Sequence, residues 1–140
     1  MTRINIIDPC ELSDQHLVAE YREIFHVGSA VQRAMQSPNK EKLLTDRPEE
    51  FTLGKGHTKF FYDKGKYLHN RYTQIVNEMK ARGMKPDPSR YFKTPQFPDE
   101  FYNDWEPDDK AYEIIRERIN LRLQQKPDWY RWTNGKNKDN

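Results

Sequence analysis

The fold is decided by residues 13–36, which read SDQHLVAEYREIFHVGSAVQRAMQ. Apolar side chains recur in this stretch at the spacing of one helical face. Ser13 is a suitable helix cap, and Asp8, which Pro9 follows, is an alternative start. The sequence therefore predicts a helix that begins at Asp8 or Ser13 and ends near residue 36. Its apolar positions are Leu17, Tyr21, Ile24, Val31 and Met35.

Two further helices are predicted on either side of a proline-rich stretch. Apolar periodicity favours one helix over about 58–82, stopped by Gly83, and another over about 108–125, ended by Pro127. We expect no β-strand, because no stretch alternates apolar and polar residues convincingly.

The connections between these helices are long. Residues 37–52 are rich in turn-forming residues and are predicted as a loop, and 84–107 hold five of the nine prolines. The prediction is an all-α fold, a single compact domain over 1–140, with three main helices joined by long irregular loops. Residues 134–140 are expected to form a frayed tail.

The composition narrows the class of protein. Only 34% of the residues are hydrophobic and 33% are charged, which suits amphipathic helices around one core, and 13% aromatic residues argue against disorder. A lone cysteine, Cys10, excludes an intrachain disulfide and favours a reducing, cytoplasmic setting. No apolar run approaches the roughly 18 residues of a membrane span, so no membrane partner is expected.

Charge is unevenly spread along the chain, although the net charge is only +2. Residues 54–93 carry ten Lys or Arg against three Asp or Glu, and residues 99–113 carry one Lys against seven Asp or Glu. The basic stretch permits phosphate contacts, but it is equally compatible with a solvated polar surface.

The four histidines show no metal-ligand spacing, so no metal is predicted. His57, between glycine and threonine, is expected to be structural. His16 stands one turn before Glu20 and either lines a site or lies on the surface.

A candidate nucleophile is the chain terminus itself. The small side chain of Thr2 permits removal of Met1, which would expose the α-amine of Thr2. An unperturbed α-amine has a pKa of roughly 7.7–8.0, so a useful fraction is neutral near neutral pH. Such an amine can form an imine with a sugar carbon. Taken alone the pattern is weak, because many chains begin in this way.

The first helix carries further candidates. Glu23, beside the apolar Ile24 and Phe25, could act as a general base or stabilise a developing cation, or could be an ordinary exposed carboxylate. The row Arg22, His26, Ser29 and Arg33 forms a polar, basic face, and Arg118 and Arg122 form a second row on the third helix. The alternative for both rows is a solvated face.

The C-terminal stretch Trp129-Tyr130-Arg131-Trp132 interleaves aromatic and basic residues. Such residues can stack on bases and bind phosphates. The alternative is a tail that packs its rings on the helices, with Trp129 packed and with Tyr130 and Arg131 reaching outward.

Several blocks of the chain together resemble the phage endonuclease V family, the pyrimidine-dimer DNA glycosylases. The first block is Met1-Thr2-Arg3-Ile4-Asn5, followed by residues 11–23, and the resemblance continues at 53–64, at Arg118 and at Pro127-x-Trp129-Tyr130. It spans nearly the whole chain, with divergent loops in 37–50 and 84–112.

This resemblance implies a compact fold of three helices with the N-terminus between them, near the active site. It implies that Thr2 attacks the anomeric carbon of a dimer nucleotide, that an imine forms, and that β-elimination then cuts the strand. Glu23 would assist both steps, without a metal or cofactor. It also implies that the DNA is kinked and that the adenine opposite the dimer is extruded.

By position, the resemblance assigns roles in DNA contact or in lining the site to Arg3, Gln15, Arg22, Arg118 and Arg122. Arg122 and Arg33 stand where lysines are familiar. His26 replaces an arginine, and protonation below about pH 6.5 could restore the missing charge. Trp132 and Thr133 replace tyrosines. The acidic segment 95–109 is expected to face away from DNA. The full set of predicted DNA-binding residues is Arg3, Gln15, Arg22, His26, Arg33, Arg118, Arg122, Trp129, Tyr130 and Arg131.

The sequence thus predicts a monomeric base-excision enzyme acting on double-stranded, ultraviolet-damaged DNA, with Thr2 and Glu23 as catalytic residues. Two alternatives stay open. The same mechanism could serve abasic sites or oxidised bases, or the chain could be a non-catalytic DNA-binding protein.

Overall fold

The computed structural model describes residues 3–87 and 97–133, and within these ranges it is helical without a named strand. Within these ranges, Lys64 and Tyr102 form an isolated antiparallel β-bridge. The all-α prediction with three main helices is therefore confirmed. The elements are η1 (Pro9–Glu11), α1 (Asp14–Gln36), α2 (Lys40–Thr45), α3 (His57–Phe60), α4 (Gly65–Ala81), η2 (Asp99–Phe101) and α5 (Asp109–Gln125).

Both predicted starts of the first helix are used. The Asp8 carboxylate accepts a hydrogen bond from the Cys10 amide at 3.0 Å and opens the short helix η1. The Ser13 hydroxyl then accepts from the His16 amide at 3.1 Å and caps α1. Two capped starts in succession turn the chain sharply before α1, because each cap satisfies backbone donors that a helix end leaves without partners.

The prediction of a loop over 37–52 is wrong in part, because α2 lies within it. Leu43 and Leu44 in this single short helix are half-buried and pack against the core. This helix was missed in the sequence because turn-forming residues surround it. Its six residues are also too few to show a helical periodicity.

The predicted helix over 58–82 is in fact two helices. α3 ends at Phe60, and α4 begins at Gly65. A Cβ at Gly65 would collide with the ring of Phe97, so this close approach requires glycine. The predicted stop is confirmed, because Gly83 has φ 83° and its amide donates to the Lys80 carbonyl at 3.0 Å. The third helix, capped by Asp108, closely matches its prediction.

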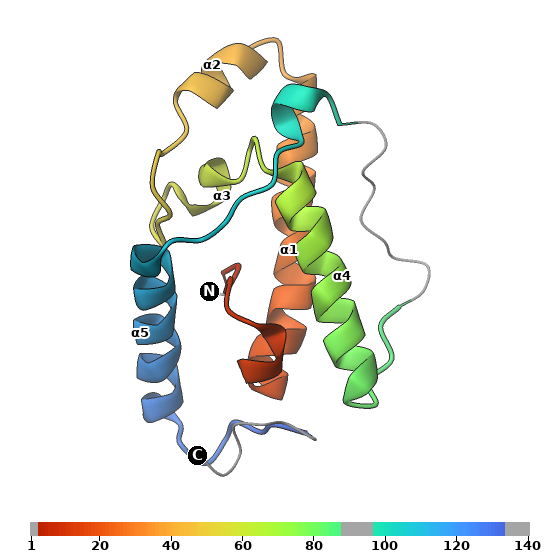
Figure 1. The fold of residues 1–140 in the computed structure, drawn as a ribbon, viewed down its shortest axis with the longest axis vertical. Helices are drawn as coiled ribbons and strands as arrows, with labels where there is room; N and C mark the ends of the chain where they lie inside the picture. The colour runs from red at the N-terminus through yellow and green to blue at the C-terminus, as the bar shows by residue number, and fades with distance from the viewer. Residues whose placement is uncertain (1–2, 88–96, 134–140) are drawn as a thin grey trace.

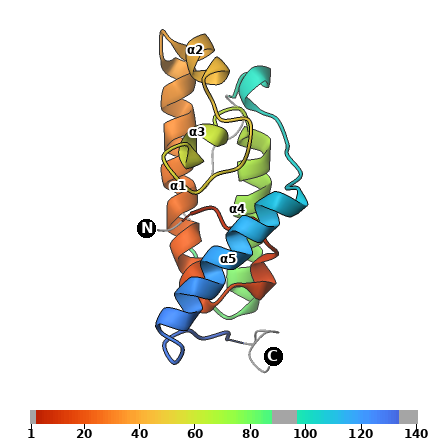
Figure 2. The ribbon, with the colours of Figure 1, turned by 90° about the vertical axis from the view of Figure 1, so that its left-hand side faces the viewer.

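α1 and α4 lie side by side, and α5 crosses them on the other side of the N-terminal segment (Figures 1 and 2). Ile4 and Ile6 from that segment share the core with Ile115 and Ile119 of α5. The N-terminal segment therefore lies between α5 and the pair α1 and α4, and an ion pair from Arg116 of α5 to Glu11 of η1 adds a direct link. This arrangement agrees with the expectation that the N-terminal region lies between helices.

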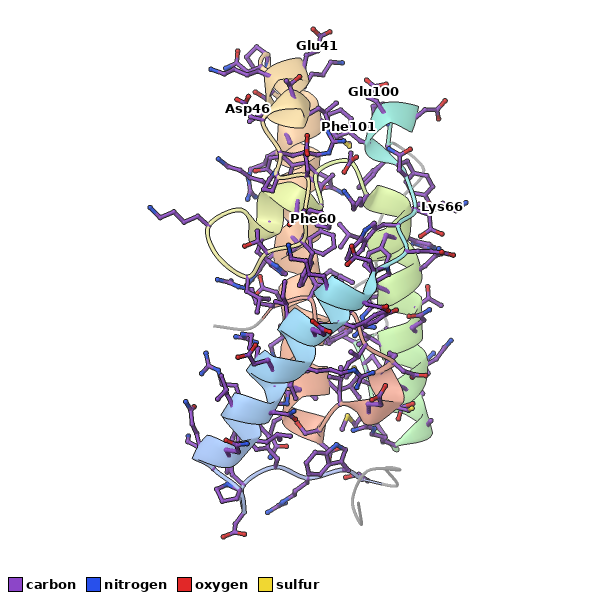
Figure 3. All side chains as sticks on the ribbon, turned by 60° about the vertical axis from the view of Figure 1, so that its left-hand side comes forward. Glu41, Asp46, Phe60, Lys66, Glu100 and Phe101 are labelled. Atoms are coloured by element: carbon purple, nitrogen blue, oxygen red, sulfur yellow. The ribbon has the colours of Figure 1, made fainter. Side chains whose placement is uncertain are left out.

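An aromatic cluster fills the core around α3, and acidic side chains gather beyond it. Phe60 points inward, while Glu41, Asp46 and Glu100 extend from the end of the molecule formed by α2 and η2 (Figure 3). α5 ends at the opposite end, where residues 126–133 also lie (Figure 1). The described part of the acidic segment, from Phe97 onward, is thus far from the aromatic tail. The predicted frayed tail over 134–140 lies outside the described residues.

Three cationic side chains of the basic stretch 54–93 are buried in ion pairs inside the fold. Arg71, Arg82 and Lys64 are 2%, 4% and 8% exposed. They pair with Glu20, with Asp14 and Glu78, and with Asp63, respectively. The local charge excess that permitted phosphate binding is therefore partly a structural feature, because buried charges must be paired.

Candidate functional site

The N-terminal segment 3–7 is held by hydrogen bonds from four parts of the chain. The Ile4 amide donates to Nε2 of His57 at 3.0 Å, and the Asn5 amide donates to Oε1 of Glu20 at 3.0 Å. Buried backbone groups need hydrogen-bond partners, and side chains from separate helices supply them here, so they fix the path of this segment. The remaining bonds run from Arg3 Nε to the Leu53 carbonyl at 2.9 Å and from Arg71 to the Ile7 carbonyl at 2.5 Å.

The chain bends within this segment at Ile6, whose φ is 47°. A positive φ is unfavourable for a β-branched residue, so the surrounding contacts must hold the bend in place. The bend separates the part of the segment bonded to α3 and α1 from the part bonded to α4.

Thr2, the predicted nucleophile, lies outside the described residues. Glu23, the predicted partner, is one helical turn after Glu20 on α1, and its side chain is 14% exposed. Nδ1 of His26 lies 4.0 Å from Oε1 of Glu23. Glu20, which anchors Asn5, therefore sits one turn from the carboxylate predicted to act on substrate.

Two adjoining hollows bring together most of the predicted DNA-binding residues. The smaller, about 160 Å³, lies between α1, α5 and the tail. The larger, about 490 Å³, opens along the outer face of α1. They share Gln15, Ala19 and Trp129 in their walls. Further lining residues are Arg118, Arg122 and Tyr130 in the first, and Arg22 and Arg131 in the second.

Positive charges are concentrated beside these hollows. Burial, and then the charges of Arg122 and Arg3, lower the pKa of Arg118. Burial and the charges of Arg118 and Arg122 also lower the pKa of His16 to about 4, so this histidine is neutral near neutral pH. A bound anion offsets the repulsion between these neighbouring cations, so the cluster favours binding of a phosphate in the hollows.

The first turn of α1 fastens the C-terminal tail. The Gln15 amide donates to the Trp129 carbonyl at 2.6 Å, and its oxygen accepts from the Arg131 amide at 3.1 Å. Asp14 accepts from the amide and hydroxyl of Thr133. The side-chain amide of Gln15, which was predicted to contact DNA, is therefore used in hydrogen bonds that orient the aromatic residues of the tail.

Within the tail, the structure reverses the predicted roles of two rings. Tyr130 stacks on His16, with ring centroids 4.8 Å apart and planes 9° from parallel, so it is packed rather than outward. Trp129 is 52% exposed instead of packed on the helices. Arg131 is exposed as expected, and Trp132 donates from Nε1 to the Glu11 carbonyl at 3.1 Å. His16, left open between site and surface, is buried beneath Tyr130 and lines the smaller hollow.

Three of the predicted DNA-binding residues line neither hollow. Arg3 lies on the N-terminal segment, where its Nε donates to the Leu53 carbonyl. His26 and Arg33 are exposed on α1 beyond Glu23 and line neither hollow. Eleven residues of helix separate Arg22 from Arg33, which is roughly 16 Å. A DNA duplex would have to extend along α1 to meet both.

Sequence reasoning missed the anchoring roles of Glu20 and Arg71 and predicted only a structural role for His57. Neither Glu20 nor Arg71 has a predicted role, and by sequence Arg71 is only one of the ten cations in 54–93. Periodicity gives no signal for them, because their partners are 15 to 64 residues away in the chain.

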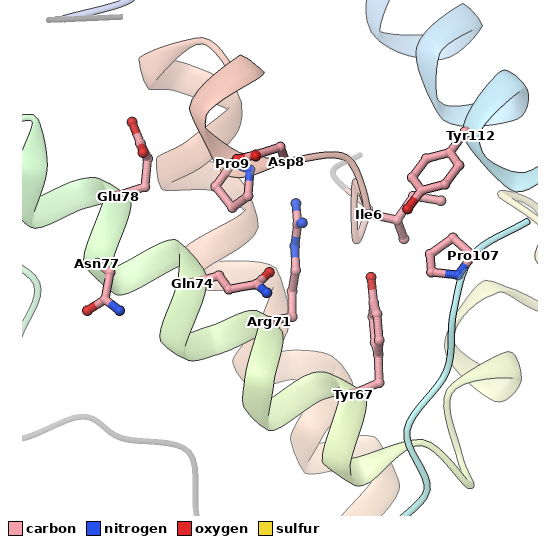
Figure 4. A pocket seen from close by; sticks show the side chains of 10 residues that line it. All are labelled: Ile6, Asp8, Pro9, Tyr67, Arg71, Gln74, Asn77, Glu78, Pro107 and Tyr112. Carbon is pink, nitrogen blue, oxygen red and sulfur yellow. The ribbon is translucent and has the colours of Figure 1, made fainter. Parts of the chain in front are cut away.

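A cavity of about 610 Å³, larger than either hollow, lies elsewhere, between η1, α4 and the start of α5. Tyr67 and Arg71 point toward it from α4 and Tyr112 from α5 (Figure 4). Its rim includes the carboxylates of Asp8 and Glu78, and none of the predicted site residues lines it. Size alone would favour this cavity, but carboxylates repel phosphate. The cationic hollows are therefore the better candidate for nucleic acid.

No group of three or more His, Cys, Asp and Glu within the described ranges has the geometry to hold a metal ion. In the same part of the chain, each helix is too short or too polar to cross a bilayer.

This site is a cationic, aromatic hollow on an all-helical fold, with a carboxylate and a firmly held N-terminal segment nearby. A family model described as pyrimidine dimer DNA glycosylase matches residues 1–92 of the 140. The chain belongs to this family of DNA-repair enzymes, which implies glycosylase activity on damaged DNA. α5 and the tail, with Arg118, Arg122 and Trp129, lie beyond the matched residues.

Proposed function

We propose that this chain is a bifunctional DNA glycosylase and abasic-site lyase, which excises cyclobutane pyrimidine dimers through an imine formed on the α-amine of Thr2. Glu23 assists the reaction as a carboxylate, and the cationic hollows bind the phosphates of the damaged duplex.

The reaction has two balanced steps. The amine nitrogen forms a bond to C1′ of the 5′ nucleotide, and the C1′–base bond breaks with its electrons and a proton going to the base. The nitrogen lone pair then forms the C1′=N bond of a protonated imine as the C1′–O4′ bond breaks, and O4′ takes up a proton when the sugar ring opens. Removal of a C2′ proton sends electrons toward the imine, and the C3′–oxygen bond breaks as the phosphate leaves. Glu23 stabilises the cation in the first step and accepts the C2′ proton in the second.

The observation that carries the proposal is the hydrogen bond from the Asn5 amide to Glu20 at 3.0 Å. It fixes the chain three residues after Thr2, beside the turn of α1 that bears Glu23. Three extended residues span at most about 11 Å. An amine tethered so closely to a partly shielded carboxylate supports a reaction that uses both groups.

The cationic residues support the choice of substrate. Arg22, Arg118, Arg122 and Arg131 surround the two hollows, and exposed Trp129 stands between them. Arginines that line a hollow suit phosphate oxygens, and an exposed indole suits stacking on an unpaired base.

A different lesion preference is the second candidate function. The packing of Tyr130 on His16 leaves Trp129 as the exposed ring at the hollows. The ring that meets the lesion governs which damaged base fits. Comparing cleavage of duplexes with a dimer, an abasic site or an oxidised purine separates the two candidates.

The experiment that tests the proposal is reductive trapping. Protein whose intact mass shows a free Thr2 is incubated with dimer-containing duplex and borohydride, and a covalent adduct at Thr2 is expected. A version with one glycine inserted before Thr2 keeps an amine but displaces it by roughly 3.5 Å, and should trap far less. If the correctly processed protein gives no adduct with dimer or abasic DNA, the chain is a non-catalytic binder and the proposal is wrong.

A further inference from the structure

His57 is buried, with 2% of its surface exposed, and it is hydrogen-bonded to the N-terminal segment. Its Nε2 accepts from the Ile4 amide at 3.0 Å, and its Nδ1 lies 2.8 Å from the Thr52 carbonyl. A carbonyl oxygen only accepts, so Nδ1 carries the hydrogen and Nε2 is the bare acceptor. The two contacts together select one neutral tautomer.

We infer that His57 is a positioning residue for the nucleophile, which holds the Ile4 amide through Nε2 and thereby fixes where the Thr2 amine is presented. The inference rests on the proposed function. The two residues from Thr2 to Ile4 span at most about 7 Å, so the Thr2 amine lies within a short chain length of this hydrogen bond.

The surroundings of His57 suit this role. Its ring lies edge to face with Phe51 and Phe61, at centroid separations of 5.5 Å and 5.3 Å, which fixes the orientation of the imidazole. Burial lowers the pKa of His57 to about 4, opposed by the bond to Thr52 and aided by the charges of Arg3 and Arg118. The neutral ring, which alone can accept from Ile4, is therefore the form present near neutral pH.

Separate anchors hold the other side of the segment. Glu20 accepts from Asn5, and Arg71 donates to the Ile7 carbonyl beyond the bend at Ile6. Loss of the His57 contact should therefore loosen the first residues without releasing the whole segment. A small displacement of a nucleophile is costly, since misplacement by about 1 Å can slow a reaction roughly hundredfold.

The test compares three variants in single-turnover trapping and in DNA affinity. His57→Phe keeps a ring in the aromatic cluster but removes both hydrogen bonds. His57→Gln keeps one acceptor and one donor. Phe60→Leu is the matched control, because Phe60 is a buried core residue on the same short helix and its side chain takes part in neither hydrogen bond of His57.

We expect His57→Phe to bind dimer-containing duplex within about threefold of wild type while its trapping rate falls by about a hundredfold. The Gln variant should recover much of that rate, and Phe60→Leu should trap at nearly the wild-type rate even though it unfolds more easily. Equal trapping by wild type and His57→Phe would overturn the inference and leave the proposed function intact. Absence of trapping by wild type would instead overturn the proposed function, and this inference with it.

A measurement on wild type covers the case in which His57→Phe does not fold. Nitrogen-15 spectra should show His57 as the neutral Nδ1–H tautomer, and the Ile4 amide should exchange slowly with solvent. The other tautomer, or a rapidly exchanging Ile4 amide, would overturn the inference.

Discussion

The carboxylate of Glu20 on α1 and the guanidinium of Arg71 on α4 share two hydrogen bonds, of 2.6 Å and 3.0 Å, where the two side chains are 0% and 2% exposed. Burial opposes the charge on Arg71, but the neighbouring Glu20 outweighs it, and the pKa of Arg71 is raised. Each partner also binds the N-terminal segment, Glu20 at Asn5 and Arg71 at Ile7. One ion pair therefore fastens two helices and the segment that leads to Thr2.

Replacing Glu20 by glutamine should strongly destabilise the protein. Arg71 would remain buried without a counter-charge, which costs about 3–5 kcal/mol in comparable sites. Urea unfolding measures the loss. The matched control is Glu41→Gln on the exposed face of α2, which should change the free energy of unfolding by no more than about 0.5 kcal/mol. Similar stabilities for the two variants would contradict the structural role of the pair.

Replacing Glu23 by glutamine should separate catalysis from binding. The amide keeps the size of the side chain but cannot accept a proton, so single-turnover cleavage should slow by roughly 10²–10⁴-fold. Affinity for dimer-containing duplex should hold or rise slightly. Glu113→Gln, exposed on α5, serves as the control. Cleavage at the wild-type rate by the Glu23 variant would show that another group removes the proton.

Replacing Gln15 by leucine should loosen the C-terminal tail at Trp129 and Arg131, while Asp14 and Glu11 still hold Thr133 and Trp132. Two hydrogen bonds to Trp129 and Arg131 disappear, each worth about 1 kcal/mol. We expect faster amide exchange at Arg131 and a fall of about tenfold in affinity for damaged DNA, which corresponds to about 1.4 kcal/mol. Gln36→Leu, exposed at the end of α1, should do neither. Unchanged exchange at Arg131 would mean that other contacts hold the tail.

Replacing Arg122 by glutamine should change the salt dependence of DNA binding. If this residue meets a phosphate, the slope of log affinity against log salt concentration falls by about one. Lys42→Gln is the control, because Lys42 is exposed on α2, at the end of the molecule opposite the C-terminal end of α5 (Figure 1). An equal slope for the Arg122 variant and wild type would remove Arg122 from the interface.

Stability should fall as the pH decreases from 6.5 toward 4. His16 and His57 have pKa values of about 4 in the folded protein, below the ordinary 6.5. Between these values the unfolded chain binds protons that the folded chain does not, so acid favours unfolding. Each histidine contributes at most about 1.4 kcal/mol per pH unit, and the contribution is complete above 6.5. Urea unfolding across this interval should show the slope, and His57→Gln should reduce it by about half. A flat profile would contradict the burial of both rings in their neutral form.

Much of the secondary structure followed from local sequence. The caps at Ser13 and Asp108 and the stop at Gly83 act on neighbouring backbone groups, so their effect can be predicted from adjacent residues. The family was identified in the same way, from runs of residues such as 11–23, because such runs need no knowledge of the fold. The short helix α2 and the break before Gly65 were missed because packing by distant residues decided them.

By itself, the sequence determined that three amphipathic helices form, and it supplied a chain terminus, a carboxylate and arginines of the right kinds for the proposed chemistry. Tertiary structure alone decided which charged groups are free to meet DNA. It buried Arg71 and Arg82 in ion pairs, turned His57 toward Ile4, and committed Gln15 to the tail. The physical reason is separation along the chain. These partners lie 51 to 114 residues apart, and helical periodicity describes only neighbours within a few turns.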